Sequence, residues 1–280
     1  MTETLRNGVS RGLIELRHTL TTPLDLWGYL FPTVLLLGVL IFMRGATVPG
    51  TDFSLGASAL PGMLGMNLAF GGLITIAQLL VVEREDGTLL RAKATPNGMS
   101  SYLVGKVVAV GGMTLVSLIA VLIPGAFLVE GLEVGPSGWL TLLWLMPLAL
   151  LATMPIGAAL GSIFESPRAF PVIMLPIFGV IAISGVFYPI SPLPGWIQGI
   201  AQVFPIYWLG LGMRSAFLPD ALASVELGDS WRQLETFGVL AAWAVVGLAL
   251  APALLRRMAR RESGSAVAAR RERMMSTVGR

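Results

Sequence analysis

Long apolar runs separated by short polar stretches dominate the chain of 280 residues. An apolar helix of about 20 residues crosses the roughly 30 Å hydrocarbon core of a bilayer, and six of the runs are long enough with their flanks. They cover residues 26–43, 56–82, 102–129, 139–164, 170–187 and 236–255. The pattern therefore predicts an all-α integral membrane protein, with six transmembrane helices in a domain at residues 25–255.

Residues 1–24 follow a different pattern, which is periodic but too charged to span a membrane. Apolar side chains recur there every three or four residues and so share one stripe of a helix. The stripe consists of Leu5, Val9, Leu13, Leu16 and Leu20. It predicts an interfacial amphipathic helix on the cytoplasmic leaflet. The alternative, a secretory signal peptide, is disfavoured because a long charged segment precedes the first apolar run and no small-residue cleavage site follows it.

Prolines divide the region between the fifth and sixth runs. Two pieces between them, residues 196–203 and 206–217, are each long enough for a brief helix. Joining them into one spanning helix would bury Arg214, at about 2.5 to 3.5 kcal/mol near the bilayer centre. We therefore expect two re-entrant half-helices on the outer side. The residues that define this region are Pro189, Pro192, Pro194, Pro205 and Arg214.

The basic residues agree with this topology. With both termini in the cytoplasm, 16 of the 19 lysines and arginines lie on the cytoplasmic side, as the positive-inside rule requires. Eight of them lie in residues 256–280, which we interpret as a basic cytoplasmic tail on anionic lipid. The chain has far more arginine than lysine, which is typical of a GC-rich genome and indicates a bacterial plasma membrane.

Composition narrows the possible functions. Only 12% of the residues are charged and the mean hydropathy is +0.78, whereas soluble domains are about 25% charged. The chain has no cysteine and one histidine, so we expect no metal site and no catalytic residue. No phosphate-binding motif is present, because Gly105-Lys106 is followed by Val107. Any ATP must therefore be bound by another polypeptide. The basic residues form no groove, so we expect no nucleic-acid partner.

The stretch at residues 83–96 is a charged island between two apolar runs. Gly87 permits a tight turn, Thr88 can cap a helix, and residues 88–94 would form two helical turns that end before Pro96. A short helix with exposed leucines and ion-pairing neighbours suits a helix-in-groove contact, although a solvated connector is the alternative. The candidate docking residues are Glu83, Arg84, Glu85, Gly87, Thr88, Leu89, Leu90 and Arg91.

The second apolar run carries three uncharged polar residues, Asn67, Thr75 and Gln78. Such side chains form hydrogen bonds between transmembrane helices, and this is the first interpretation. Lining of a translocation path is the second. No run carries an acidic residue in its middle, which disfavours an ion-coupled secondary transporter.

Two segments of the chain resemble a known family. The first reads Glu-Arg-Glu-Asp-Gly-Thr-Leu-Leu-Arg-Ala-Lys-Ala-Thr-Pro at residues 83–96, followed by Tyr-Leu-Val-Gly-Lys at residues 102–106. It resembles the loop between spans two and three of ABC-2 type transporter permeases, which include the daunorubicin-resistance permeases. The second segment, at residues 184–194, 204–208 and 212–214, is similar to the region after span five in that family.

The resemblance implies a division of labour between chains. The docking residues would form the coupling helix, seated in a groove of a separate ABC ATP-binding subunit that binds ATP and Mg²⁺. Two such subunits would serve two permease chains, here a homodimer, and residues 1–24 would be the connecting helix. Many members have a leucine-rich continuation where this chain has Lys93-Ala94.

These observations predict an exporter permease. The spans offer small, weakly polar residues without fixed charge, which suits an amphipathic or hydrophobic substrate such as a drug or a lipid. Two alternatives stay open. One is a membrane scaffold or sensor that docks a cytosolic partner without transport, and the other is a secondary transporter.

Overall fold

The computed structural model describes residues 2–43, 45–46, 54–95, 97–129, 132, 135–163 and 170–261. These parts of the chain are almost entirely helical and contain no extended strand. Five described helices are long and apolar enough to cross a membrane. They are Pro23–Met43, Leu55–Glu85, Gly98–Leu128, Pro136–Ile163 and Gln233–Leu255. The prediction of an all-α membrane protein is confirmed.

The fifth predicted span is shorter than the apolar run suggested. Helix α8, Phe170–Ile183, has 14 residues and would be about 21 Å long, too short to cross the hydrocarbon core unaided. The run was predicted to remain helical to residue 187, but the chain turns at Gly185, whose φ of +64° lies in the left-handed region. Residues 164–169, at the end of the fourth apolar run and before the fifth, and residues 262–280 of the predicted tail lie outside the described residues.

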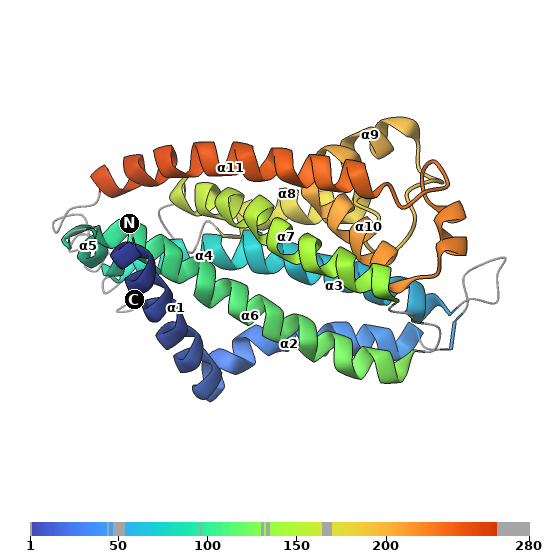
Figure 1. Cartoon of the computed structure of the whole chain (residues 1–280), viewed down its shortest axis with the longest axis horizontal. Helices are drawn as coiled ribbons and strands as arrows, with labels where there is room; N and C mark the ends of the chain where they lie inside the picture. Colours follow the sequence, from blue (N-terminus) through green and yellow to red (C-terminus); the bar gives the residue numbers. More distant parts are fainter. Residues whose placement is uncertain are drawn as a thin grey trace, which may run out of the picture.

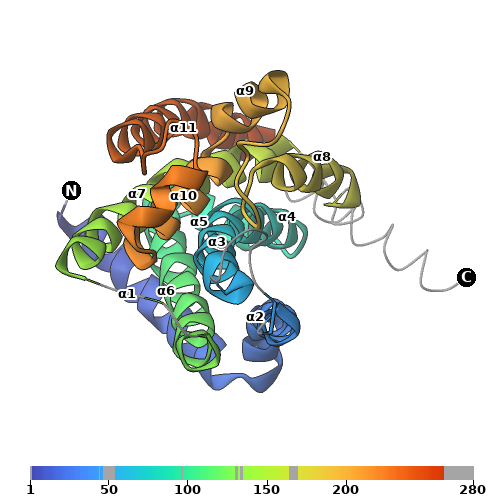
Figure 2. The same cartoon turned by 90° about the vertical axis from the view of Figure 1, so that its right-hand side faces the viewer.

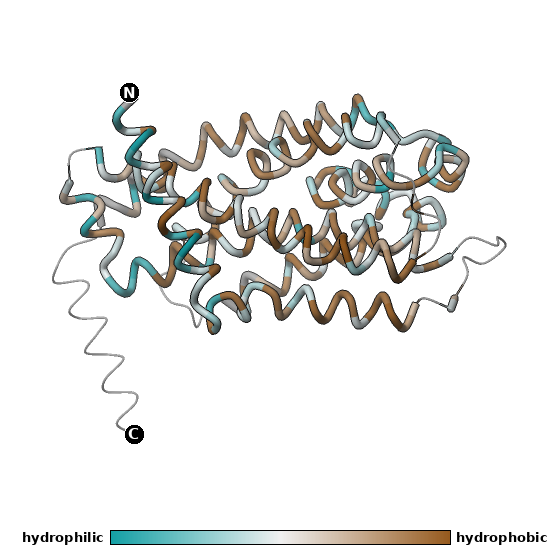
Figure 3. Tube along the Cα trace, turned by 60° about the horizontal axis from the view of Figure 1, so that its bottom comes forward, coloured by the Kyte–Doolittle hydropathy of each residue, from teal (hydrophilic) through white to brown (hydrophobic). Residues whose placement is uncertain are grey.

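The long helices run side by side along one axis (Figure 1). They are α2 (Pro23–Met43), α3 (Leu55–Phe70) with α4 (Ile76–Glu85), α6 (Gly98–Leu128), α7 (Pro136–Ile163) and α11 (Gln233–Arg261). The short helix α5 (Thr88–Lys93) lies at one end, here called the α5 end. Helices α9 (Gly195–Val203) and α10 (Pro205–Phe217) lie toward the other, the α10 end. Hydrophilic residues gather toward both ends (Figure 3).

Helix α2 lies at the edge of the bundle, whereas α3 lies inside it (Figure 2). Most of α3 is buried, and few residues of α2 are. The chain of α3 passes very close to the turn after α8, because a Cβ atom on Gly62 would lie 1.7 Å from the carbonyl oxygen of Val186. Small residues permit this kind of backbone contact between apolar helices, where packing replaces the hydrophobic effect as the driving force.

The predicted amphipathic helix is α1, Thr2–Thr21, and it packs along the first half of α6. Glycine makes the contact: a Cβ atom on Gly12 would lie 2.5 Å from the carbonyl oxygen of Gly105. Most of the predicted leucine stripe points away from this contact, and Leu5 and Leu13 are exposed. The helix therefore joins the bundle through its glycine face and leaves an apolar face available to lipid.

Candidate functional site

The candidate docking segment forms a tight helix–turn–helix at the α5 end. Helix α4 ends at Glu85, and Gly87 adopts the left-handed φ of +81° that reverses the chain. The Asp86 carboxylate accepts a hydrogen bond of 2.7 Å from the backbone N–H of Thr88. The Arg91 guanidinium donates a hydrogen bond of 3.0 Å to the Thr88 hydroxyl. The predicted helix at residues 88–94 is confirmed to within one residue.

Helix α5 has a buried face and an exposed face. Leu89 and Ala92 are buried in an apolar cluster with Leu80 of α4, Tyr102 of α6 and Leu255 of α11. The expectation that both leucines are exposed to a partner is therefore wrong for Leu89, which anchors α5 to its own chain.

The surface that α5 leaves accessible is mixed in character. Arg91 is exposed, while Glu85, Thr88 and Leu90 are half-buried. Asp86, in the turn before the helix, is also exposed. The accessible face thus carries one partly exposed leucine among charged and polar groups. Of the candidate docking residues, a partner could therefore reach Arg91 fully and Glu85, Thr88 and Leu90 in part.

Glu83, near the end of α4, belongs to a partly buried ionic network inside the bundle. The ammonium group of Lys106, only 4% exposed, donates hydrogen bonds to Glu83 and to Glu15. The Tyr102 hydroxyl donates to the other carboxylate oxygen of Glu83. The Arg11 guanidinium lies 5.3 Å from the centroid of the Tyr102 ring. The network joins three helices, α1, α4 and α6.

The burial of charge at the α5 end corrects two interpretations of the sequence. The position of Lys106 near the start of its span favours a side chain that extends toward the membrane surface, but its charge is neutralised inside the bundle by two carboxylates. Arg84, a candidate docking residue, is also buried. The sequence carried one signal that could have shown the network: Tyr102 and Lys106 lie one helical turn apart, so they share a face of the helix that follows the charged island.

The three polar residues of the second span do not form one site. The Asn67 amide donates a hydrogen bond of 2.8 Å to the Ser117 hydroxyl, which also lies 2.8 Å from the Thr33 hydroxyl. This cluster links α2, α3 and α6, as the first interpretation expected for Asn67. Thr75 instead bonds to a carbonyl of its own helix, at 3.5 Å, and Gln78 is exposed. Their place on a translocation path stays a prediction.

A π-helical segment, η1, interrupts the second span at Gly71–Thr75. It lies where the backbone meets two neighbouring helices. A Cβ atom on Gly71 would lie 2.1 Å from the hydroxyl oxygen of Thr114 in α6, and one on Gly72 would lie 1.8 Å from that of Thr153 in α7. Such segments are frequent at functional sites. The Gly-Gly pair was the only sequence signal for it.

The α10 end contains the two predicted half-helices, α9 and α10. Pro194 precedes α9 and Pro205 is the first residue of α10, while Pro189 and Pro192 lie in the turn after α8. Nearly all of α10 is buried, and it packs mainly against α3, α7 and α11. The predicted pieces are thus helices of their own, and neither continues into a longer one.

Arg214 of α10 forms a buried ion pair at this end. Its Nε donates a hydrogen bond of 2.7 Å to Glu226, and a terminal nitrogen donates one of 2.9 Å to the carbonyl of Gly185. Glu226, which follows the 3₁₀ helix η3 (Asp220–Val225), is buried with it. The sequence analysis missed Glu226, although it is one of few acidic residues in this region.

Comparison with known families decides the class of the protein. The model of a family described as ABC-2 family transporter protein matches residues 47–252, most of the chain. The chain belongs to the ABC-2 family. No curated protein sequence matches it.

As an ABC-2 protein, the chain is the multi-pass membrane subunit of an ABC transporter, and the family implies an ABC ATP-binding partner. The match includes α5, η1 and both half-helices but not α1. It does not distinguish daunorubicin-resistance permeases from other ABC-2 members. The predicted domain boundaries, at residues 24 and 255, stay predictions.

Proposed function

We propose that this ABC-2 protein is the permease of an exporter, which moves an amphipathic or hydrophobic molecule outward. Two copies would pair with each other and with two ATP-binding subunits, which would bind ATP and Mg²⁺ at the cytoplasmic α5 end. The complex would lie in a bacterial plasma membrane with both termini of the permease in the cytoplasm. The observation that carries the proposal is α5, a short helix anchored by one face and accessible by the other.

The contacts of α5 supply a path for movement from the partner to the spans. Leu89 packs α5 against the ends of the neighbouring helices, and the short turn at Gly87 limits the movement of α5 relative to α4. Lys106 then ties α4 to α1 and α6 through the two carboxylates. A displacement of α5 would therefore move these helix ends as one body, which is a recognised form of coupling.

The second span would receive that displacement directly. Helices α3, η1 and α4 form one continuous helical segment from Leu55 to Glu85. The π-helical turns of η1 lie within it, where α6 and α7 contact the backbone. In the proposed cycle, the α4 part moves with α5 and the α3 part moves relative to α10, opening a path between the two permease copies.

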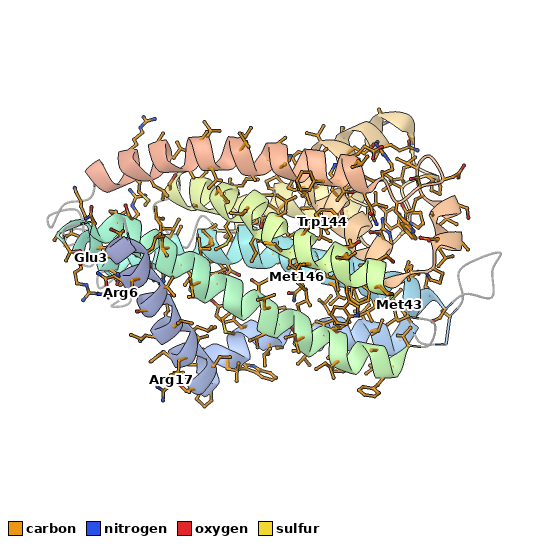
Figure 4. The ribbon with its side chains drawn as sticks, viewed as in Figure 1. Glu3, Arg6, Arg17, Met43, Trp144 and Met146 are labelled. Atoms are coloured by element: carbon orange, nitrogen blue, oxygen red, sulfur yellow. The ribbon has the colours of Figure 1, made fainter. Side chains whose placement is uncertain are left out.

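The central test reverses one charge on the accessible face of α5. Arg91→Glu should lower co-purification of the ATP-binding subunit by about tenfold, which corresponds to roughly 1.4 kcal/mol of binding free energy. The matched control is Arg17→Glu, because Arg17 is exposed on α1 and points away from the bundle (Figure 4). Both permeases should insert at normal levels. Undiminished co-purification with the Arg91 variant would contradict docking through α5.

A scaffold or sensor subunit is the second candidate, since the same docking face would serve it. The two functions differ in a reconstituted complex. An exporter should hydrolyse ATP faster when its substrate is added, and a set of lipids and hydrophobic drugs is the appropriate screen. A scaffold should show no stimulation by any of them and no movement of the compound across the vesicle membrane. Membership of the ABC-2 family does not fit the third candidate, a secondary transporter.

A further inference from the structure

An apolar cavity of about 140 Å³ lies among α4, α6, α7 and α11. It occupies the half of the bundle nearest α5, because its α11 wall ends at Leu255 and its α6 wall begins at Tyr102. Met154 and Ala158 of α7 and Ala251 of α11 form buried parts of the lining.

The lining has no polar group available to a ligand. Lys106 and Tyr102 contribute to it, but the Lys106 ammonium group is bonded to Glu15 and Glu83, and the Tyr102 hydroxyl is bonded to Glu83. A water molecule in a cavity needs two to four polar partners, so this one should be dry. An engineered apolar cavity of about 150 Å³ in another protein binds benzene, which sets the size of group that fits.

The cavity reaches the exposed apolar surface of two candidate membrane spans. Val107 of α6 is 48% exposed and Leu248 of α11 is 53% exposed, and both residues line the cavity. An apolar group can therefore enter sideways from the bilayer. At that depth, the apolar groups at highest concentration are the acyl chains of the leaflet next to α5.

We propose that this cavity binds the end of a lipid acyl chain. Its lining residues Leu80, Tyr102 and Leu255 belong to the same apolar cluster as Leu89 and Ala92 of α5. An acyl chain in the cavity would therefore pack against the same residues that hold the buried face of α5. Binding of the acyl chain does not depend on the proposed export function, whereas a role of this packing in docking the ATP-binding subunit rests on it.

The experiment uses the full chain in lipid nanodiscs that contain a phospholipid with a photoreactive group at one acyl-chain end. Labelling of the buried wall, at Met154, Ala158 and Ala251, is expected by mass spectrometry. Ala251→Leu fills the cavity and should lower labelling of Met154 and Ala158 at least about fivefold. The control is Ala253→Leu, on an exposed position of the same helix, which should leave the labelling unchanged.

The positions of the labels distinguish an acyl chain in the cavity from lipid on the outside surface. Labels confined to Val107 and Leu248 would show lipid on the outside surface only and would overturn the proposal. Equal labelling of Met154 in the Ala251→Leu protein would overturn it as well. Size-exclusion profiles of both variants should match that of the unmodified protein. If Ala251→Leu prevents folding, Ala158→Val replaces it as the cavity-filling variant.

Discussion

At the α10 end of the bundle one arginine and one glutamate are enclosed together, whereas at the α5 end one lysine is shared by carboxylates from two other helices. Arg214 and Glu226 lie 12 residues apart, and their side chains are 5% and 1% exposed. Lys106 lies 91 residues from Glu15 and 23 from Glu83, and these carboxylates are 29% and 14% exposed. The first pair closes a local segment, and the second joins distant ones.

The difference suits the two ends to different tasks. A charge pair removed from water loses its hydration and cannot separate without leaving an uncompensated charge, so the Arg214 pair should hold the α10 end in one arrangement. Water reaches part of the Lys106 network, which lowers the cost of rearranging it. In the proposed exporter, the α10 end would move as one rigid unit, while the α5 end would rearrange when the ATP-binding subunit moves. The two charged networks differ in the direction that these two tasks require.

Loss of the arginine at the α10 end should have the largest effect. Arg214→Leu leaves Glu226 buried without its partner, and we expect the free energy of unfolding to fall by about 3 to 5 kcal/mol. Titration with a denaturing detergent from mild micelles measures this quantity. The double variant Arg214→Leu/Glu226→Leu should recover most of the loss, because no isolated charge remains. A single variant as stable as the unmodified protein would remove the basis of the comparison.

Loss of the lysine at the α5 end should cost less. Lys106→Met leaves two carboxylates that retain partial access to water, and we expect about 2 kcal/mol by the same titration. Co-purification of the ATP-binding subunit should persist while substrate-stimulated ATP hydrolysis falls, because α4 loses its tie to α1 and α6. If this variant loses as much stability as Arg214→Leu, the two ends are equally rigid and the distinction fails.

The turn before α5 should show a smaller effect on stability with a clear effect on coupling. Gly87→Val places a branched side chain in a left-handed conformation, which costs about 1 to 2 kcal/mol. Relief of that strain would rotate α5 and so reduce transport per ATP hydrolysed. Gly87→Asn is the control, since asparagine tolerates this conformation and should retain most of the transport. Equal efflux per ATP from the valine and asparagine proteins would contradict a role for the turn geometry.

Local patterns in the sequence predicted the features at both ends that depend only on residues close together in the chain, namely helices and turns. Apolar runs located the helices, prolines separated α9 from α10, and Gly87 marked the turn before α5. Contacts across the bundle were not predictable in this way. Nothing near Lys106 indicates that its partners are Glu15 and Glu83, because the pairing depends on how α1 and α4 pack against α6.

The same limit explains two wrong expectations, one at the candidate site and one in the fold. Leu89 and Leu90 are equivalent by composition, and only the position of α5 against Leu80 and Leu255 decides that Leu89 is the buried one. The run at residues 170–187 is uniformly apolar, so its hydropathy does not show where the helix ends. The left-handed turn at Gly185 and the close contact of Val186 with α3 end it earlier.

Between the two ends, the Asn67–Ser117–Thr33 cluster provides a reference for uncharged contacts, with the smallest expected effect. Ser117→Ala removes the hydroxyl that both neighbours contact, and measured hydrogen bonds of this kind in membranes average about 0.6 kcal/mol. The control is Ser162→Ala, since the Ser162 hydroxyl bonds to the carbonyl of Ala159 in its own helix. A loss above about 2 kcal/mol for Ser117→Ala would exceed the largest such bond measured in membranes. The two charged networks would then not be the main determinants of rigidity, and the contrast between the ends would lie in their neutral packing instead.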